Sequence, residues 1–115
     1  MAYYLVQVAY TPEAWSALIR HPHDRIAALR PVLDKLGGRI ESSYFAFGEY
    51  DIVAILDMPA SVDAAAFSLA ATAGGALKAL KTTPLLTAAE GVEAMQKAAT
   101  LGYEPPTAIG RAVGV

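Results

Sequence analysis

The run Phe47-Gly48-Glu49-Tyr50-Asp51 lies between two apolar segments and constrains the fold more than any other stretch of this chain. Residues 43–47 lead into the Gly-Glu pair, and residues 52–56 follow Asp51. Glycine at the first central position of a type II′ turn accepts a positive φ, so two strand-like segments joined by a Gly-X pair predict a tight β-hairpin. We therefore expect adjacent antiparallel strands over residues 39–47 and 51–58.

The segments on either side of this hairpin predict two further strands and several helices. Strands are expected over residues 3–10 and 76–86, and Pro84 places the second of these at a sheet edge or a bulge. Helical spacing and capping signals predict helices over residues 13–20, from residue 22 or 24 to residue 36, over residues 62–73 and over residues 88–99.

Local capping residues set the predicted helix ends. Thr87 is the expected N-cap of the last helix, in a Thr-x-x-Glu capping box with Glu90. Ser61 or Asp63 is expected to cap the helix over residues 62–73. The pair Gly37-Gly38 is a C-cap signal, because glycine adopts the left-handed conformation at low cost.

In chain order these elements read β-α-β-β-α-β followed by a terminal helix. That order predicts an α+β fold of the ferredoxin-like plan, with an antiparallel sheet covered by helices on one side. We expect a single domain over residues 1–100 and an irregular tail over residues 101–115.

Both faces of the predicted sheet are largely apolar, which indicates a partner chain. Hydrophobic residues make up 55% of the 115 residues and charged residues 17%, so a domain of this size has more apolar surface than its own core can bury. Helices can cover only one face. Sheet-to-sheet packing of two copies, a dimeric α/β barrel, would cover the other, so we expect a homodimer or a higher homo-oligomer. The alternative is that the terminal helix or the tail covers it.

Charge, cysteine content and run length exclude several classes of protein. The formal net charge of -2 gives no electrostatic reason to expect nucleic acid, and the absence of cysteine excludes disulfides and thiolate chemistry. The longest apolar run, residues 64–77, is shorter than the roughly 20 residues of a membrane-spanning helix. No basic leader precedes the first strand, so we expect a cytoplasmic protein without a membrane or nucleic-acid partner.

The signature Gly48-Glu49-Tyr50-Asp51, followed by residues 52–55, resembles that of the GYD-domain family of small bacterial and archaeal proteins. Supporting matches lie along most of the chain: Tyr4-Leu5-Val6, Tyr10-Thr11, Leu36-Gly37-Gly38-Arg39, Tyr44, Met58-Pro59 and Leu85-Leu86-Thr87 with Glu90. The resemblance covers roughly residues 3–100 and implies a dimeric α/β barrel. The family's biochemical role is largely unassigned, and neither the run at residues 21–23 nor the tail beyond Gly102 maps onto the signature.

Tyrosines, an amide and carboxylates near the hairpin form the candidate site. We expect an apolar, tyrosine-lined cleft that binds a small apolar or aromatic ligand through Gln7, Tyr44, Glu49, Tyr50 and Asp51. The leading interpretation is a small-molecule-binding or regulatory protein. The hairpin also resembles that of the ligand-sensing domain in leucine-responsive regulators, although this chain lacks their DNA-binding portion.

Two alternatives give the same residues other roles. In a cofactor-independent isomerase or monooxygenase-like enzyme, Asp51 or Glu49 would be the general base, with a pKa raised in an apolar cleft. In a structural assembly unit, Gly48 and Glu49 make the turn and Asp51 caps backbone amides.

The run His21-Pro22-His23 contains the candidate metal ligands. His-x-His spacing occurs in metal sites, and Asp24 and Glu13 are near in sequence. Two histidines do not complete a tetrahedral site, and no haem or phosphate-binding motif is present, so we predict no metal and no cofactor.

Overall fold

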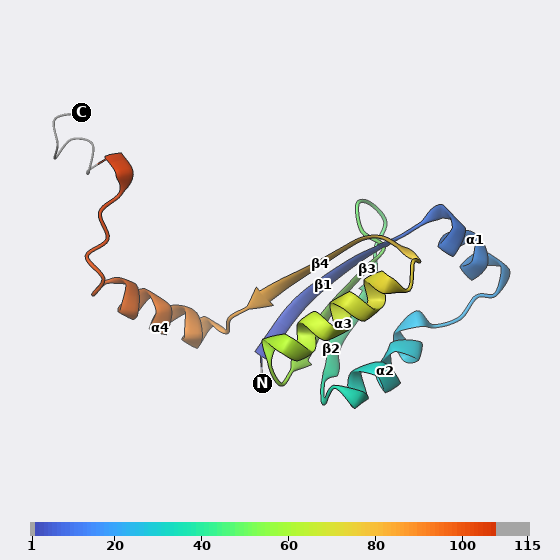
Figure 1. Cartoon of the computed structure of the whole chain (residues 1–115), viewed down its shortest axis with the longest axis horizontal. Helices are drawn as coiled ribbons and strands as arrows, with labels where there is room; N and C mark the ends of the chain where they lie inside the picture. The colour runs from blue at the N-terminus through green and yellow to red at the C-terminus, as the bar shows by residue number, and fades with distance from the viewer. Residues whose placement is uncertain (1, 108–115) are drawn as a thin grey trace. The chain divides into compact units, whose positions relative to one another are not determined.

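The computed structural model describes residues 2–107, which form four strands and four helices (Figure 1). In chain order the elements are β1 (Ala2–Tyr10), α1 (Pro12–Arg20), α2 (Arg25–Lys35), β2 (Arg39–Phe45), β3 (Ile52–Met58), α3 (Ser61–Ala73), β4 (Leu77–Leu85) and α4 (Ala88–Ala98). The chain divides into two compact units, residues 1–85 and residues 86–115. The predicted irregular tail is described only to residue 107, and residues 101–105 are in neither a helix nor a strand.

All four strands form one antiparallel sheet in the order β2-β3-β1-β4. β2 and β4 are therefore the edges, and Pro84 lies on an edge strand as predicted. β3 pairs along its whole length with residues 2–8 of β1. The mixed α+β class is confirmed.

The connection between β2 and β3 is longer than the predicted two-residue turn. β2 ends at Phe45 and β3 begins at Ile52, and the Ala46 N–H closes the loop of residues 46–51 by donating to the Asp51 carbonyl at 2.9 Å. Gly48 has a φ of 157°, whereas the first central residue of a type II′ turn has a φ of about 60°. The type II′ prediction is therefore wrong: Asp51 closes a wider loop, because its carbonyl accepts from Ala46 while its N–H donates to the Val8 carbonyl of β1 at 2.7 Å.

One face of the sheet holds the hydrophobic core. α2 and α3 both lie on this covered face (Figure 1). Its strand residues are buried against Leu33 of α2, which is 1% exposed, and Phe67 of α3. The strand residues concerned are Tyr4, Val6, Val8, Ile52, Ala54 and Leu56.

The opposite face, here called the open face, is also apolar. Leu5, Val53 and Ile55 alternate with the core residues along β1 and β3 and are only half-buried. Tyr44 of β2 is 70% exposed. The structure thus reproduces the two apolar faces expected from the sequence.

A Schellman motif ends α2 at the predicted glycine pair. The Gly37 and Gly38 N–H groups donate to the carbonyls of Asp34 and Leu33, each at 3.0 Å, and Gly37 has a φ of 75°. A side chain at Gly38 would collide with Sδ of the fully buried Met58. Gly38 is therefore needed because of packing, whereas Gly37 is needed because of its conformation.

The predicted cap of α3 is wrong. Ala60 is the N-cap, without a side-chain hydrogen bond, and Ser61 is already the first helical residue. The helix begins sooner because Pro59 ends β3 and the extended Ala60 turns the chain directly into α3. None of the helices within residues 2–107 combines the length and apolar character that crossing a bilayer needs.

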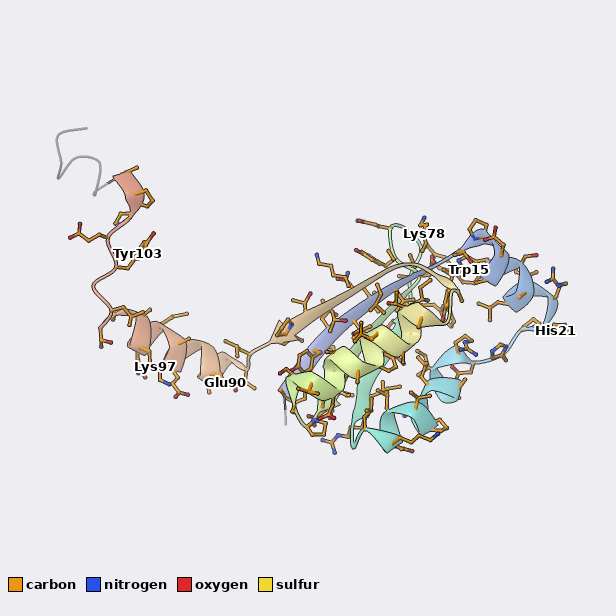
Figure 2. The ribbon with its side chains drawn as sticks, viewed as in Figure 1. Trp15, His21, Lys78, Glu90, Lys97 and Tyr103 are labelled. Atoms are coloured by element: carbon orange, nitrogen blue, oxygen red, sulfur yellow. The ribbon has the colours of Figure 1, made fainter. Side chains whose placement is uncertain are left out.

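The predicted capping box starts α4. The Glu90 N–H donates to Thr87 Oγ1 at 3.1 Å, and the Thr87 N–H donates to Glu90 Oε1 at 2.9 Å. Glu90 is labelled in Figure 2. The hydrogen bonds from the Thr87 backbone and side chain lower the pKa of the Glu90 carboxyl below its ordinary value.

We predict that the start of α4 loosens in acid. Because the pKa of Glu90 is lower in the folded state, its stabilising contribution is complete above its unfolded pKa and disappears as the pH falls through the lowered folded value. An NMR titration should show the Thr87 amide resonance moving with that lowered pKa. In Glu90→Gln the amide should not titrate, and a Thr87 amide that is also insensitive to pH in the parent chain would contradict the prediction.

Candidate functional site

Two predicted ligand-binding residues share one row of the open face. The strand register aligns Tyr44 of β2 with Val53 of β3, and Val53 with Gln7 of β1. Tyr44 and Gln7 are therefore two strands apart, about 10 Å between backbones. The half-buried Gln7 is also aligned with Lys81 of β4, so the row carries a phenol, an amide and an ammonium.

The other predicted residues lie in the loop that follows β2. Glu49 is exposed, whereas Tyr50 and Asp51 are half-buried. The Asp51 side chain is directed to the junction of β1 and α1, where Oδ2 accepts from the Tyr10 N–H at 2.9 Å and from the Trp15 Nε1–H at 3.1 Å. The structure therefore places Gln7 and Tyr44 in one row of the open face, whereas Asp51 has a different set of neighbours.

Asp51 ties the β2–β3 loop to the start of α1. The rings of its two donor residues, Tyr10 and Trp15, meet edge to face with centroids 5.6 Å apart. Thr11 caps the same helix by accepting from the Ala14 N–H at 3.1 Å. These contacts agree with the interpretation in which Asp51 satisfies backbone and side-chain donors.

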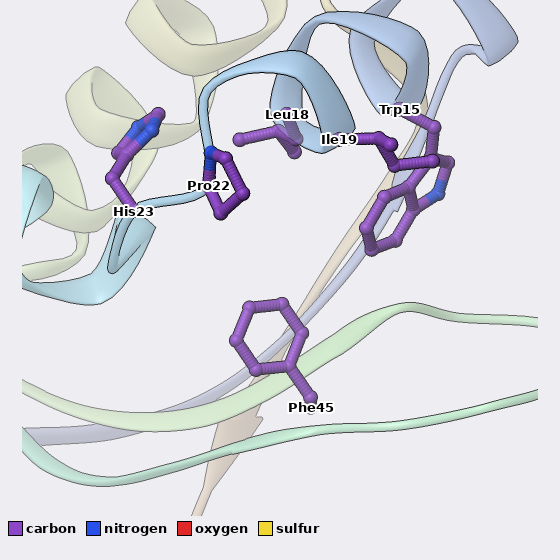
Figure 3. Close-up of a pocket in the computed structure, with 6 residues that line it drawn as sticks. All are labelled: Trp15, Leu18, Ile19, Pro22, His23 and Phe45. Carbon is purple, nitrogen blue, oxygen red and sulfur yellow. The ribbon is translucent and has the colours of Figure 1, made fainter.

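An apolar cleft of about 340 Å³ lies beside this junction, between α1 and the end of β2 (Figure 3). We call it the outer cleft, and its walls are formed by Trp15, Leu18, Ile19, Pro22, His23 and Phe45. Figure 3 shows the Phe45 ring on the opposite side of the space from Leu18, Ile19 and Pro22. Ile19 is 73% and Phe45 52% exposed, so the walls are apolar surfaces open to water. The volume is near the lower end of the range for small-molecule sites.

His23 is the polar residue of the outer cleft. Its Nδ1 lies 2.8 Å from the His21 carbonyl, and its Nε2 lies 3.2 Å from Arg25 Nη1. A carbonyl only accepts, so Nδ1 carries the proton and Nε2 accepts from the guanidinium, which fixes the neutral tautomer. Both ring nitrogens are thus occupied by neighbours.

The candidate metal ligands His21 and His23 are not joined by further metal-binding side chains within residues 2–107. His21 is exposed between α1 and α2 (Figure 2). Across residues 2–107, no three His, Cys, Asp or Glu side chains come together in a group that could hold a metal ion.

The most buried carboxylate belongs to Asp57, which the sequence did not single out. It is 2% exposed, and its Oδ2 lies 3.1 Å from Arg39 Nη2. Arg39 also pairs with Glu41 at 2.8 Å, and these two carboxylates raise the pKa of the guanidinium. Asp57 Oδ1 has no hydrogen-bond partner within the described part of the chain. Because Arg39 covers this carboxylate, the arrangement is a structural ion pair at the end of the sheet.

Trp15, Leu18 and Phe45 were missed by the sequence analysis as site residues. The chain contains a single tryptophan, in a short helix whose apolar residues face one side, and that was the only available signal. Phe45 meets α1 only through the tertiary fold, so spacing in the sequence could not connect them.

The comparisons with known proteins identify a family and nothing narrower. Neither the curated proteins nor the solved structures gave a match to this chain. The family model described as GYD domain matches residues 4–98, which include the Gly48–Asp51 signature and all eight strands and helices in whole or in part. The chain therefore belongs to the GYD domain family.

Proposed function

We propose that the protein is a cytoplasmic homodimer of ferredoxin-like units and that the open faces of two copies pack together as a dimeric α/β barrel. The strand order β2-β3-β1-β4 and the antiparallel pairing support the ferredoxin-like unit. The half-buried Leu5, Val53 and Ile55 support the packing, because a second sheet would remove their remaining apolar surface from water.

The function best supported by the geometry is binding of a small apolar or aromatic molecule in the outer cleft. The observation that carries this proposal is the space of about 340 Å³ walled by the exposed apolar side chains of Ile19 and Phe45. Gln7 and Tyr44 are proposed as a second set of polar groups, on the face where the two copies meet. A ligand-dependent change in assembly would make such a protein a regulator.

The enzyme alternative receives less support. The two hydrogen bonds that Asp51 Oδ2 accepts give this carboxylate a structural role, and Glu49 is exposed on a loop, outside the lining of the outer cleft. The assembly-unit alternative accounts for the open face but leaves the exposed apolar walls of the outer cleft without a role.

Native mass spectrometry of the purified chain tests the proposal, followed by calorimetric titration with 1-naphthol as an apolar aromatic probe. We expect a dimer that either carries a reproducible extra mass or binds 1-naphthol. Ile19→Glu should abolish binding, and Leu69→Glu, at a similarly exposed site on α3, should not. A ligand-free dimer that does not bind the probe would favour the assembly unit, and a monomer would contradict the barrel.

A further inference from the structure

The small side chains of α3 leave a cavity between this helix, α2 and the sheet. This space measures about 290 Å³, and a second space of about 290 Å³ lies between α1 and the start of α2. They share Tyr10, Arg25 and Ala76 as lining residues, so we treat them as one inner chamber. Its deeper part is apolar and is lined mainly by Val8, Leu29, Phe67, Ala70, Ala71, Leu77 and Leu80.

The shallower part of the inner chamber adjoins the outer cleft. Leu18 and His23 line both the outer cleft and the shallower part of the chamber.

Arg25 is the one cationic residue that lines both parts of the chamber. It is half-buried, and its Nη1 donates to His23 Nε2 at 3.2 Å. The ion pairs of residues 2–107 involve only Arg39 and Lys97 as cations, so Arg25 has no carboxylate within ion-pair distance there. A partly desolvated guanidinium without a counter-ion is costly, and a bound anion would offset that cost.

The position of Arg25 in α2 adds to this argument. It is the first residue of the helix, where the macrodipole favours anions and disfavours cations. The neighbouring Asp24 forms no ion pair with it; Asp24 Oδ1 instead caps the helix by accepting from the Ile26 and Ala27 N–H groups at 2.9 and 3.2 Å. Helix stability alone thus gives no reason for an arginine here.

We infer that the inner chamber binds a carboxylate with an apolar body. The body lies against Leu29, Phe67 and Leu80, and the carboxylate pairs with the guanidinium of Arg25, whose planar fork matches two carboxylate oxygens. His23 is a positioning residue, since its Nε2 holds Nη1 of Arg25. This inference rests on the proposed small-molecule function and names the chemical class of the ligand.

Calorimetric titration of the full chain with octanoate and with octan-1-ol tests the inference, since the two probes differ mainly in charge. The parent chain should bind octanoate more tightly. Arg25→Met should weaken octanoate binding by about tenfold or more and leave octan-1-ol binding unchanged, because charge-assisted hydrogen bonds are lost while the apolar contacts remain. Arg30→Met is the matched control, since Arg30 belongs to the same helix but is exposed and lines neither part of the chamber; both affinities should be unchanged.

A second pair of variants tests the place of binding. Ala71→Leu puts a larger side chain into the chamber and should abolish binding of both probes, whereas Ala66→Leu, at an exposed site on α3 outside the lining, should not. Circular dichroism should show both variants folded.

The outcomes separate this inference from the proposed function. Octanoate binding that is unchanged in Arg25→Met would overturn the carboxylate inference but leave a small-molecule site. The same holds if octan-1-ol binds and octanoate does not. Failure of both probes overturns the inference, and the proposed function fails with it only if the chain also carries no extra mass and does not bind 1-naphthol.

Discussion

Ile55→Lys is expected to convert the proposed dimer into a folded monomer. Ile55 lies on the central strand β3, in the row of the open face that aligns it with Leu5 of β1 and Ser42 of β2. A two-fold interface contains every substitution twice, so two ammonium groups would be placed in an apolar contact. Removing a central anchor typically costs about 2 kcal/mol or more, and the buried charges add to this, so the dissociation constant should rise by at least about a hundredfold.

Sedimentation equilibrium over a range of protein concentrations measures this effect. The monomer should keep its fold, because Ile55 points away from the core formed by Leu33 and Phe67. Leu69→Lys is the matched control: Leu69 is 71% exposed on α3, and its replacement should leave the dimer intact. An Ile55→Lys chain as dimeric as the parent would show that the open face is not the interface.

Asp51→Ala is expected to destabilise the fold by about 3 kcal/mol, since hydrogen bonds to a charged acceptor contribute about 1.5–3 kcal/mol each and are not fully additive. The substitution leaves the Tyr10 N–H and the Trp15 Nε1–H without their acceptor. Asp51→Asn keeps a carbonyl oxygen at this position and should cost about 1 kcal/mol. Urea unfolding at a fixed protein concentration, followed by Trp15 fluorescence, measures both values.

Glu49→Ala is the control for this pair, because Glu49 lies in the same loop but is exposed; its effect should be within about 0.5 kcal/mol. The result also separates two roles of the carboxylate. A structural Asp51 changes the free energy of unfolding. If Asp51→Ala left stability unchanged and abolished a measured turnover, the residue would instead be the general base of an enzyme.

The elements of the fold could be predicted because their signals are local. The Thr87–Glu90 capping box and the Gly37-Gly38 C-cap each depend on residues within one helical turn, and both are present as expected. The β2–β3 turn could not be predicted. The Ala46–Asp51 hydrogen bond closes this loop, and a further one ties Asp51 to Val8, a residue distant in the sequence.

The contrast between local signals and long-range contacts also explains why the predicted site differs from the observed cavities. The sequence analysis grouped Gln7 and Tyr44 in one candidate cleft, and the strand register brings them into one row. The outer cleft and the inner chamber form where α1, α2 and α3 pack against the sheet. In the sequence, nothing distinguishes Arg25 from an ordinary exposed helix residue. The space beside it forms only in the folded chain, where the side chains of α3 are small.

The edge strands of the sheet also limit how copies of this chain can meet. β4 carries Lys78, Lys81 and Pro84, and β2 has a register irregularity between Ile40 and Ser42. Lysines, proline and bulges are devices by which natural proteins prevent further strands from adding to an open edge. With both edges blunted in this way, sheet extension into fibrils is disfavoured, so the chain can keep a large apolar face without a ready route to amyloid-like aggregation.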